Sequence, residues 1–138
     1  MPTSQADAER ILKTIHTIAS VGLSANPERE SHQIDAYLAE HGFRVIAINP
    51  TVTELFGEKA YPSLDDLPEL PDAVQIFRKP EDVPPIVERV IARGVKVLWF
   101  QIGTTNGEAA EKARKAGVQV VEDQCMRDTH RRLGGSAG

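Results

Sequence analysis

The stretch VGLSANPERES, residues 21 to 31, combines residue types that could hold an anion. Gly22 permits a tight turn, and Ser24 and Asn26 carry short polar side chains. Arg29 and Ser31 stand at the start of the helical pattern that follows. Free backbone N–H groups and the positive end of a helix dipole favour phosphate, and a guanidinium adds a charge-assisted contact. This spacing predicts a phosphate-binding loop between a strand and a helix.

The same loop also has a purely structural interpretation, which the residues alone leave open. Ser31 would cap the helix and Asn26-Pro27 would form a turn, as happens in proteins without any ligand. The loop keeps one glycine where a dinucleotide fingerprint has three, and Asn49 occupies the place of the acidic residue that holds a ribose. No basic residue follows Asn49 to meet a 2′-phosphate, so the sequence disfavours both NAD and NADP.

A second candidate for chemistry is the pair Cys125 and His130, close to Arg127, Arg131 and Arg132. A base or a cation beside a thiol lowers its pKa and makes it a nucleophile. A free cysteine is, however, commonly a small buried apolar residue, and we favour that interpretation. We therefore assign no catalytic residue. One cysteine and four scattered histidines give no metal-ligand set either.

Apolar periodicity predicts the elements that must position these residues. Helices are expected after Asp7, from Ser31 as N-cap to Gly42 as C-cap, and over residues 83–94, 106–117 and 123–133. Buried strands are expected at TIASVGL, FRVIAINP, AVQIFRKP, VKVLWFQIG and VQVVED. The segment 53–72, rich in Pro, Asp and Glu, is expected to be a loop with short helical turns over a sheet edge.

Strands that alternate with helices predict a Rossmann-like, doubly wound α/β fold: a mainly parallel five-stranded sheet in a three-layer αβα single domain. Ligands of such folds bind outside the carboxyl ends of the strands, near the switch in strand order. The candidate positions are Gly22-Leu23-Ser24, Asn49-Pro50, Phe77-Arg78, Gln101-Ile102-Gly103 and Asp123-Gln124-Cys125.

For some residues in or near these positions, a structural role is an alternative to contact with a ligand. Arg78 would pair with Glu81 or Asp82 as an exposed ion pair, although its place at a strand end favours a ligand role. Trp99 and Phe100 lie within an apolar strand and are expected in the core rather than in the site.

The composition sets limits on the class of protein. The 138 residues suit one domain, expected over 1–133, with a disordered tail at 134–138. A net charge of −4 without long basic runs excludes an electrostatic footprint for nucleic acid or an anionic membrane. The apolar runs are shorter than the roughly 20 residues of a membrane span, and one cysteine fits a reducing compartment. We expect a cytoplasmic protein.

Several short motifs, separated along the sequence, resemble those of a known protein family. The blocks G-x-S-x-N-P-x-R-x-S, I-N-P, Y-P-S-L, F-R-x-P-E and C-x-x-x-x-H-R occur in order over residues 10 to 133. They resemble the small bacterial and archaeal CoA-binding proteins, which are similar to the CoA-binding domain of the succinyl-CoA synthetase α-subunit.

The resemblance implies that the first β-α loop holds coenzyme A by its nucleotide and pyrophosphate. The phosphate end would consist of Gly22, Leu23, Ser24, Asn26, Arg29 and Ser31, with Asn49 and Pro50 on the adenosine side. Neighbouring walls would come from Phe77, Arg78 and Pro80, and then from Gln101 and Gly103. An uncharged Asn49 is compatible with the 3′-phosphate of CoA, which a carboxylate there would repel.

The resulting expectation is a protein that binds CoA or a short acyl-CoA, with no catalysis of its own established. The resemblance implies that the synthetase chemistry depends on a second domain with a phosphorylated histidine, and we expect no such domain within these 138 residues. Two alternatives stay open: an enzyme in which Cys125 exchanges thiols or takes an acyl group, and a CoA-responsive module that docks on a partner acyltransferase or ligase.

Overall fold

The protein, described here over residues 3–134 of a computed structural model, is built around a parallel five-stranded sheet. The strands are β1 (Thr17–Val21), β2 (Arg44–Ile48), β5 (Ala73–Ile76), β6 (Val97–Phe100) and β7 (Gln119–Val121), in the order β2-β1-β5-β6-β7. All four neighbouring pairs are parallel. The predicted doubly wound fold is confirmed.

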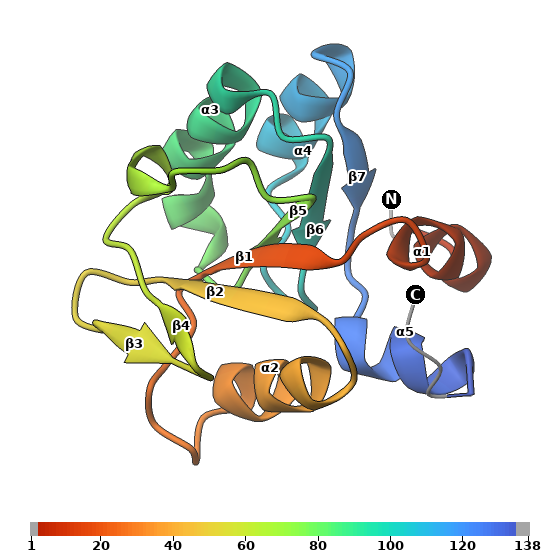
Figure 1. Cartoon of the computed structure of the whole chain (residues 1–138). Helices are drawn as coiled ribbons and strands as arrows, with labels where there is room; N and C mark the ends of the chain where they lie inside the picture. The colour runs from red at the N-terminus through yellow and green to blue at the C-terminus, as the bar shows by residue number, and fades with distance from the viewer. Residues whose placement is uncertain (1–2, 135–138) are drawn as a thin grey trace.

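Helices cover both faces of the sheet (Figure 1). One face carries α3 (Val83–Arg93) and α4 (Gly107–Lys115). The other carries α1 (Gln5–Leu12), α2 (Glu30–Glu40) and α5 (Met126–Arg132). We call these the α3/α4 face and the α2/α5 face. The three-layer arrangement follows from right-handed crossovers between parallel strands. The crossover after β1 passes through α2 on one face, and those after β5 and β6 pass through α3 and α4 on the other.

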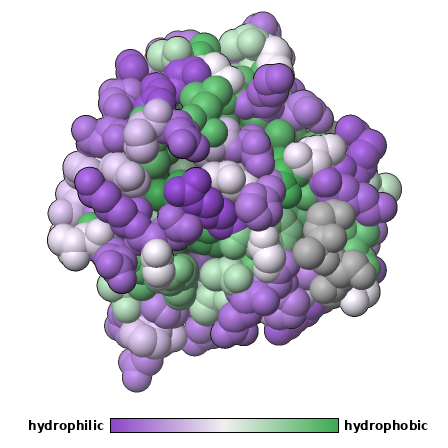
Figure 2. Space-filling model, viewed as in Figure 1, coloured by the Kyte–Doolittle hydropathy of each residue, from purple (hydrophilic) through white to green (hydrophobic). Residues whose placement is uncertain are grey.

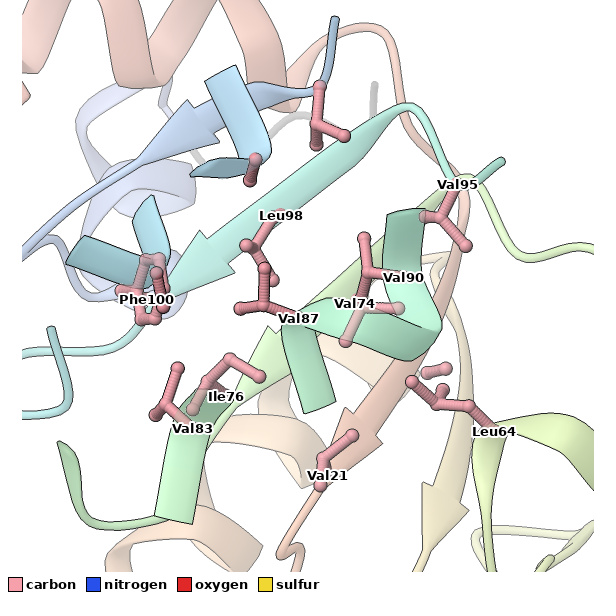
Figure 3. Close-up of a cluster of buried hydrophobic side chains, with 14 of the residues drawn as sticks. Val21, Leu64, Val74, Ile76, Val83, Val87, Val90, Val95, Leu98 and Phe100 are labelled. Atoms are coloured by element: carbon pink, nitrogen blue, oxygen red, sulfur yellow. The ribbon is translucent and has the colours of Figure 1, made fainter. Parts of the chain in front are cut away.

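Alternate residues of each strand point to opposite faces, as the twofold repeat of a strand requires. On the α3/α4 face, strand residues such as Val74, Ile76 and Leu98 pack against Val87 and Val90 of the helix in a wholly apolar cluster (Figure 3). Trp99 and Phe100, predicted as core, are both fully buried and lie on opposite faces.

The segment between β2 and β5 contains more structure than the sequence predicted. Its short helical turn is present as a 3-10 turn, η1 (Leu64–Asp66), but residues before it form a hairpin of β3 (Glu54–Leu55) and β4 (Glu58–Lys59). The hairpin leads Tyr61 to the outer edge of β2, where its N–H donates to the Ala47 carbonyl at 3.0 Å and its carbonyl accepts from Asn49 N–H at 2.9 Å. An edge is therefore covered, as expected, by strand-like pairing.

Two sequence expectations concern the chain as a whole. The predicted disordered tail, 134–138, lies outside the described residues except for Gly134. Within residues 3–134, none of the helices has the length and apolar character to cross a membrane.

The strand order reverses direction between β1 and β5. From β1 the chain crosses to β2 on one side, and β5 then returns to the opposite side of β1. The loops that leave the carboxyl ends of β1 and β5 thus diverge toward opposite faces of the sheet. They open a crevice at the carboxyl edge of the sheet. In Figure 1 the carboxyl ends of β1 and β2 lie at the left of the molecule.

Candidate ligand-binding site

Gly22, the first residue after β1, lies at the centre of this crevice. Its N–H donates to the Ile48 carbonyl at 3.1 Å, and its φ is +90°, a conformation that favours glycine. A Cβ at this position would lie 2.8 Å from Cδ of Arg78, which follows β5. Both the tight turn and the close approach of Arg78 therefore require a residue without a side chain.

The loop after Gly22 is ordered by its own short polar side chains. Ser24 Oγ accepts from the Asn26 N–H and Asn26 Oδ1 accepts from the Glu28 N–H, both at 3.0 Å. The Ser24 N–H in turn donates to Ser31 Oγ at 3.1 Å. These bonds fold the loop back onto the first turn of α2.

The predicted N-cap role of Ser31 is wrong. The N-cap residue is Arg29, whose side chain makes no capping hydrogen bond, and Ser31 lies inside the first turn of α2. The Ser31 hydroxyl is instead used to hold the loop. Consequently, the positive end of α2 meets the crevice without a side-chain oxygen from its N-cap, which suits an anionic ligand.

On one side of Gly22 lies a hollow of about 330 Å³, which we call the polar hollow. Six of the predicted CoA-contact residues line it, together with Ile102 from a candidate strand-end position and with Glu30 and Thr104, which the sequence did not single out. The predicted ones are Gly22, Ser24, Arg29, Ser31, Phe77 and Gln101.

Gln101 is the most buried polar residue of this hollow, with only 4% of its surface exposed. Its backbone is fixed, since its carbonyl accepts from both Thr104 N–H and Thr104 Oγ1, at 3.0 and 2.7 Å. Its side-chain Oε1 is buried and accepts no hydrogen bond from the described residues. A buried acceptor without a donor costs about 1–3 kcal/mol, which a ligand N–H or O–H would recover.

On the other side of Gly22 lie two overlapping hollows of about 370 and 220 Å³, which we call together the apolar groove. Asn49, Pro50 and Arg78, all predicted, line its inner part. The rest of its lining comes from residues that were not predicted as CoA contacts. The apolar ones are Val21, Ile48, Pro62, Leu64, Pro85 and Ile86, and the polar or charged ones are Ser63, Glu81, Asp82 and Arg89. Pro62 belongs to the Y-P-S-L block, which was the available signal for this wall.

Asn49 connects the two loops that flank the groove. Its Nδ2 donates to the Leu23 carbonyl at 3.0 Å, while its Oδ1 accepts from the N–H and the hydroxyl of Thr51. Leu23, a predicted site residue, is fully buried and lines neither the polar hollow nor the groove. No negative charge is introduced where the loops meet.

Arg78 forms the ion pair that the sequence offered as its alternative. Its Nη2 lies 3.1 Å from Asp82 Oδ2, and both side chains are largely exposed. The guanidinium nevertheless borders the apolar groove, so a ligand anion would compete with Asp82 for it.

Three other predicted residues lie near the site without lining either hollow. Asn26 is exposed in the loop, and Gly103 is exposed after β6. The Pro80 carbonyl accepts from Asn106 Nδ2 at 2.9 Å, which ties the start of α3 to the start of α4.

Directly beneath the crevice, on the α2/α5 face, lies a buried polar triad of Ser20, Asp35 and Gln75. Gln75 Nε2 donates to Ser20 Oγ at 3.0 Å and to Asp35 Oδ1 at 2.9 Å. Burial raises the pKa of the Asp35 carboxyl to about 7, although hydrogen bonds from Ser20 and Gln75 oppose this rise. The sequence signal that we missed was Gln75, a polar residue inside an otherwise apolar strand.

The residues considered for covalent chemistry occupy the core. Cys125 is 5% exposed and packs within the apolar cluster of the α2/α5 face. His130 is fully buried, and its Nδ1 lies 2.8 Å from the Tyr37 hydroxyl. The described residues contain no group of His, Cys, Asp and Glu side chains suited to a metal ion.

Comparisons with known proteins show relatives over nearly the whole domain. The profile of a family described as "CoA binding domain" matches residues 16–131. An uncharacterized protein, YneT, from Bacillus subtilis is 35% identical over 127 residues, which cover 92% of this chain and 94% of that protein. A solved structure of a hypothetical protein from Pyrococcus horikoshii OT3 has 39% identity and a TM-score of 0.87, with 96% of each chain covered.

A larger relative shows the same unit within a longer chain. The ADP-forming acetate–CoA ligase I of Archaeoglobus fulgidus is 28% identical over 119 residues, which are 79% of this chain but only 17% of the ligase. The similarity therefore concerns one part of that enzyme.

Proposed function

This chain belongs to the CoA binding domain family, and from that premise we propose that it binds coenzyme A or a short acyl-CoA at the carboxyl edge of its sheet. The observation that carries the proposal is the start of α2. An N-terminus without a side-chain cap, Ser24 and Arg29 all face one hollow beside Gly22. This is the arrangement that a pyrophosphate needs.

The flanking residues fit the remaining parts of the nucleotide. Asn49 and Pro50 line the groove on the adenosine side, and the uncharged amide of Asn49 leaves room for the 3′-phosphate. Arg78 borders the same groove and would exchange Asp82 for a ligand phosphate. The free Cys125 supports a reducing compartment, and we propose a cytoplasmic location.

Isothermal titration of the purified, ligand-stripped protein with CoA tests this function. We expect saturable binding that weakens with added salt, since phosphate contacts are electrostatic. Absence of heat, together with absence of CoA in the supernatant of the denatured, unstripped protein, would contradict it.

Ser24→Ala and Arg29→Ala assign the binding to the loop. Each should weaken CoA binding by about 1.5–3 kcal/mol, the scale of a lost charge-assisted hydrogen bond. Arg10→Ala is the matched control, because Arg10 is an exposed arginine of α1 that lines neither hollow. Unchanged affinity in both loop variants would place the phosphates elsewhere.

A further inference from the structure

We propose that His32 and Phe56 are positioning residues for the ligand site: the tip of the β3–β4 hairpin holds the His32 ring, and this ring holds the loop after Gly22 in its binding shape. This inference rests on the proposed CoA binding and deepens it. The hairpin, residues 54–59, lines neither the polar hollow nor the apolar groove, so it acts on the site only through α2.

The first support is the way in which Ser24 is fixed. Its N–H donates to Ser31 Oγ at 3.1 Å, and its carbonyl oxygen lies 2.9 Å from Nδ1 of His32. A carbonyl oxygen only accepts, so Nδ1 carries the proton and donates it. Two side chains from the first turn of α2 therefore hold both backbone polar groups of Ser24. The Ser24 hydroxyl accepts from the Asn26 N–H, and it can donate its own proton to a ligand phosphate.

The second support is a ring contact between α2 and the tip of the hairpin. The rings of His32 and Phe56 meet edge to face, with 4.9 Å between their centroids and 62° between their planes. This is a favourable geometry for two aromatic rings. The hairpin lies beside the start of α2 (Figure 1). Because both side chains are half-buried, the contact restricts the orientation of the imidazole that donates to Ser24.

The third support is the backbone conformation of Phe56. Its φ is +54°, and the φ of Gly57 is +78°, in a two-residue turn between the paired Leu55 and Glu58. Positive φ at both central residues is the pattern of a type I′ turn, for which Asn-Gly is a preferred pair. A bulky residue is an outlier at the first of these positions and has a conformational cost. The contact with His32 offsets part of this cost and gives the strained side chain a role at the site.

The base of the hairpin is fixed to the sheet. The Ala60 N–H donates to the Thr53 carbonyl at 2.9 Å, which closes the base. Glu58 forms an ion pair with Arg44 of β2, with 3.1 Å between Oε2 and Nε, and Tyr61 pairs with the edge of β2. The hairpin therefore connects the edge of β2 to the first turn of α2.

Phe56→Asn tests the inference because it removes the ring and places the preferred Asn-Gly pair in the turn. Isothermal titration of the full chain with CoA measures the effect. We expect the affinity to fall about fivefold, the scale of one aromatic pair, whereas a side chain that served only the turn would leave it within about twofold.

Leu55→Ala is the matched control for lost packing. Leu55 belongs to the same hairpin and packs, like Phe56, against the apolar cluster of the α2/α5 face. The variant keeps the contact between Phe56 and His32, so CoA affinity should change by less than about twofold. Equal losses in Leu55→Ala and Phe56→Asn would assign the effect to packing of the hairpin and would refute the positioning role.

A double-mutant cycle tests whether His32 and Phe56 act as one unit. His32→Ala removes both the ring and the donor to Ser24, and it should lower CoA affinity by about fivefold to tenfold. Phe56→Asn added to His32→Ala should cause little further loss, because Phe56 acts through the ring. Losses that multiply in the double variant would show two independent residues and would overturn the inference.

The tautomer of His32 is a readout that packing alone would not change. In the ligand-free, ¹⁵N-labelled chain above about pH 8, where an ordinary imidazole is neutral, long-range ¹H–¹⁵N correlations identify the protonated ring nitrogen. We expect the Nδ1–H tautomer in the wild type and in Leu55→Ala, and a mixture of both tautomers in Phe56→Asn. An unchanged Nδ1–H tautomer in Phe56→Asn would show that the hairpin does not hold the ring.

These outcomes separate the inference from the proposed function. If the wild type does not bind CoA, CoA binding itself is refuted and the positioning role falls with it. If the wild type binds CoA and Phe56→Asn binds it equally well, only the positioning role is refuted.

Discussion

The two faces of the sheet are built from the same strands yet have different interiors. The α3/α4 face is filled by aliphatic residues, alanines and Phe100, and within residues 3–134 it has no buried polar triad between sheet and helix (Figure 3). The α2/α5 face buries Ser20, Asp35 and Gln75 beneath the loop that starts at Gly22. One face therefore serves mainly packing, and the other places polar groups under the site.

The difference shows how a small domain combines stability with a binding crevice. An apolar interface stabilises in proportion to the area that it buries, and it is insensitive to pH. Burial of a carboxyl group costs desolvation free energy when the group is ionised, so its contribution to stability changes with pH. On the side of the molecule seen in Figure 2, hydrophobic areas lie among hydrophilic residues, and this view of the surface does not reveal the difference between the two interiors.

The largest expected effect comes from a cavity on the α3/α4 face. Phe100→Ala should lower the free energy of unfolding by about 4 kcal/mol, because it removes a fully buried ring from a packed cluster. Urea denaturation at pH 5 and pH 8 measures it, with Phe100→Leu as the control that keeps most of the volume. A similar loss at both pH values supports the comparison, and a strongly pH-dependent loss speaks against it.

The next effect belongs to Asp35 on the α2/α5 face. Its pKa rises from 3.8 to about 7 on folding, so the folded state holds the proton more tightly than the unfolded state. Stability is therefore highest below the unfolded pKa and falls as pH rises toward 7. Between pH 5 and pH 8 this decrease should be of the order of 3 kcal/mol.

Asp35→Asn sharpens this second prediction, since an uncharged amide replaces the protonated acid. The variant should lack this part of the pH dependence and should exceed the wild type in stability at pH 8. Parallel stability profiles of the two proteins from pH 5 to pH 8 would show that the carboxyl does not titrate in this range.

A smaller effect is expected at the boundary between the faces. Gly22→Ala should destabilise by about 1–2 kcal/mol for the positive φ, with an added cost for moving Arg78. Gly94→Ala is the matched control, because Gly94 also has a positive φ but no heavy atom within 4 Å of an added Cβ. The excess at Gly22 should disappear when Arg78→Ala is combined with it. An excess that persists in the double variant would assign the cost to the backbone.

The smallest effect is expected from the exposed ion pair at the start of α3. Arg78→Ala should change the free energy of unfolding by less than about 1 kcal/mol, and by less still in 0.5 M salt, because both partners are solvated. A larger, salt-independent loss would mean that Arg78 packs as part of the α3/α4 face.

Much of the fold was predictable because its signals are local. The β-branched runs predicted all five strands of the parallel sheet, and Gly94 ends α3 as expected, with φ of +76°. The β3–β4 hairpin escaped prediction because each strand has only two residues, too few for an alternating pattern.

The site residues that directly follow a strand were predictable from the sequence. Gly22, Asn49 and Gln101 were chosen for their place after strands, and all three line the crevice. The roles of Ser31 and Asp35 were not predictable in this way. The role of Ser31 depends on the N–H of Ser24, seven residues earlier in the loop. The role of Asp35, in α2, depends on Gln75 of β5, which is distant in the sequence.

The pairing of Tyr61 with the rim of β2 also bears on how the molecule behaves at high concentration. An exposed strand edge is a template for strands of other chains and so for aggregation. At one margin of the sheet, Tyr61 occupies the backbone groups of Ala47 and Asn49. At the other, the three-residue β7 is followed by Glu122, whose backbone pairs with Thr3. The chain thus occupies backbone groups at one end of each edge strand, which leaves fewer of them for intermolecular strand addition.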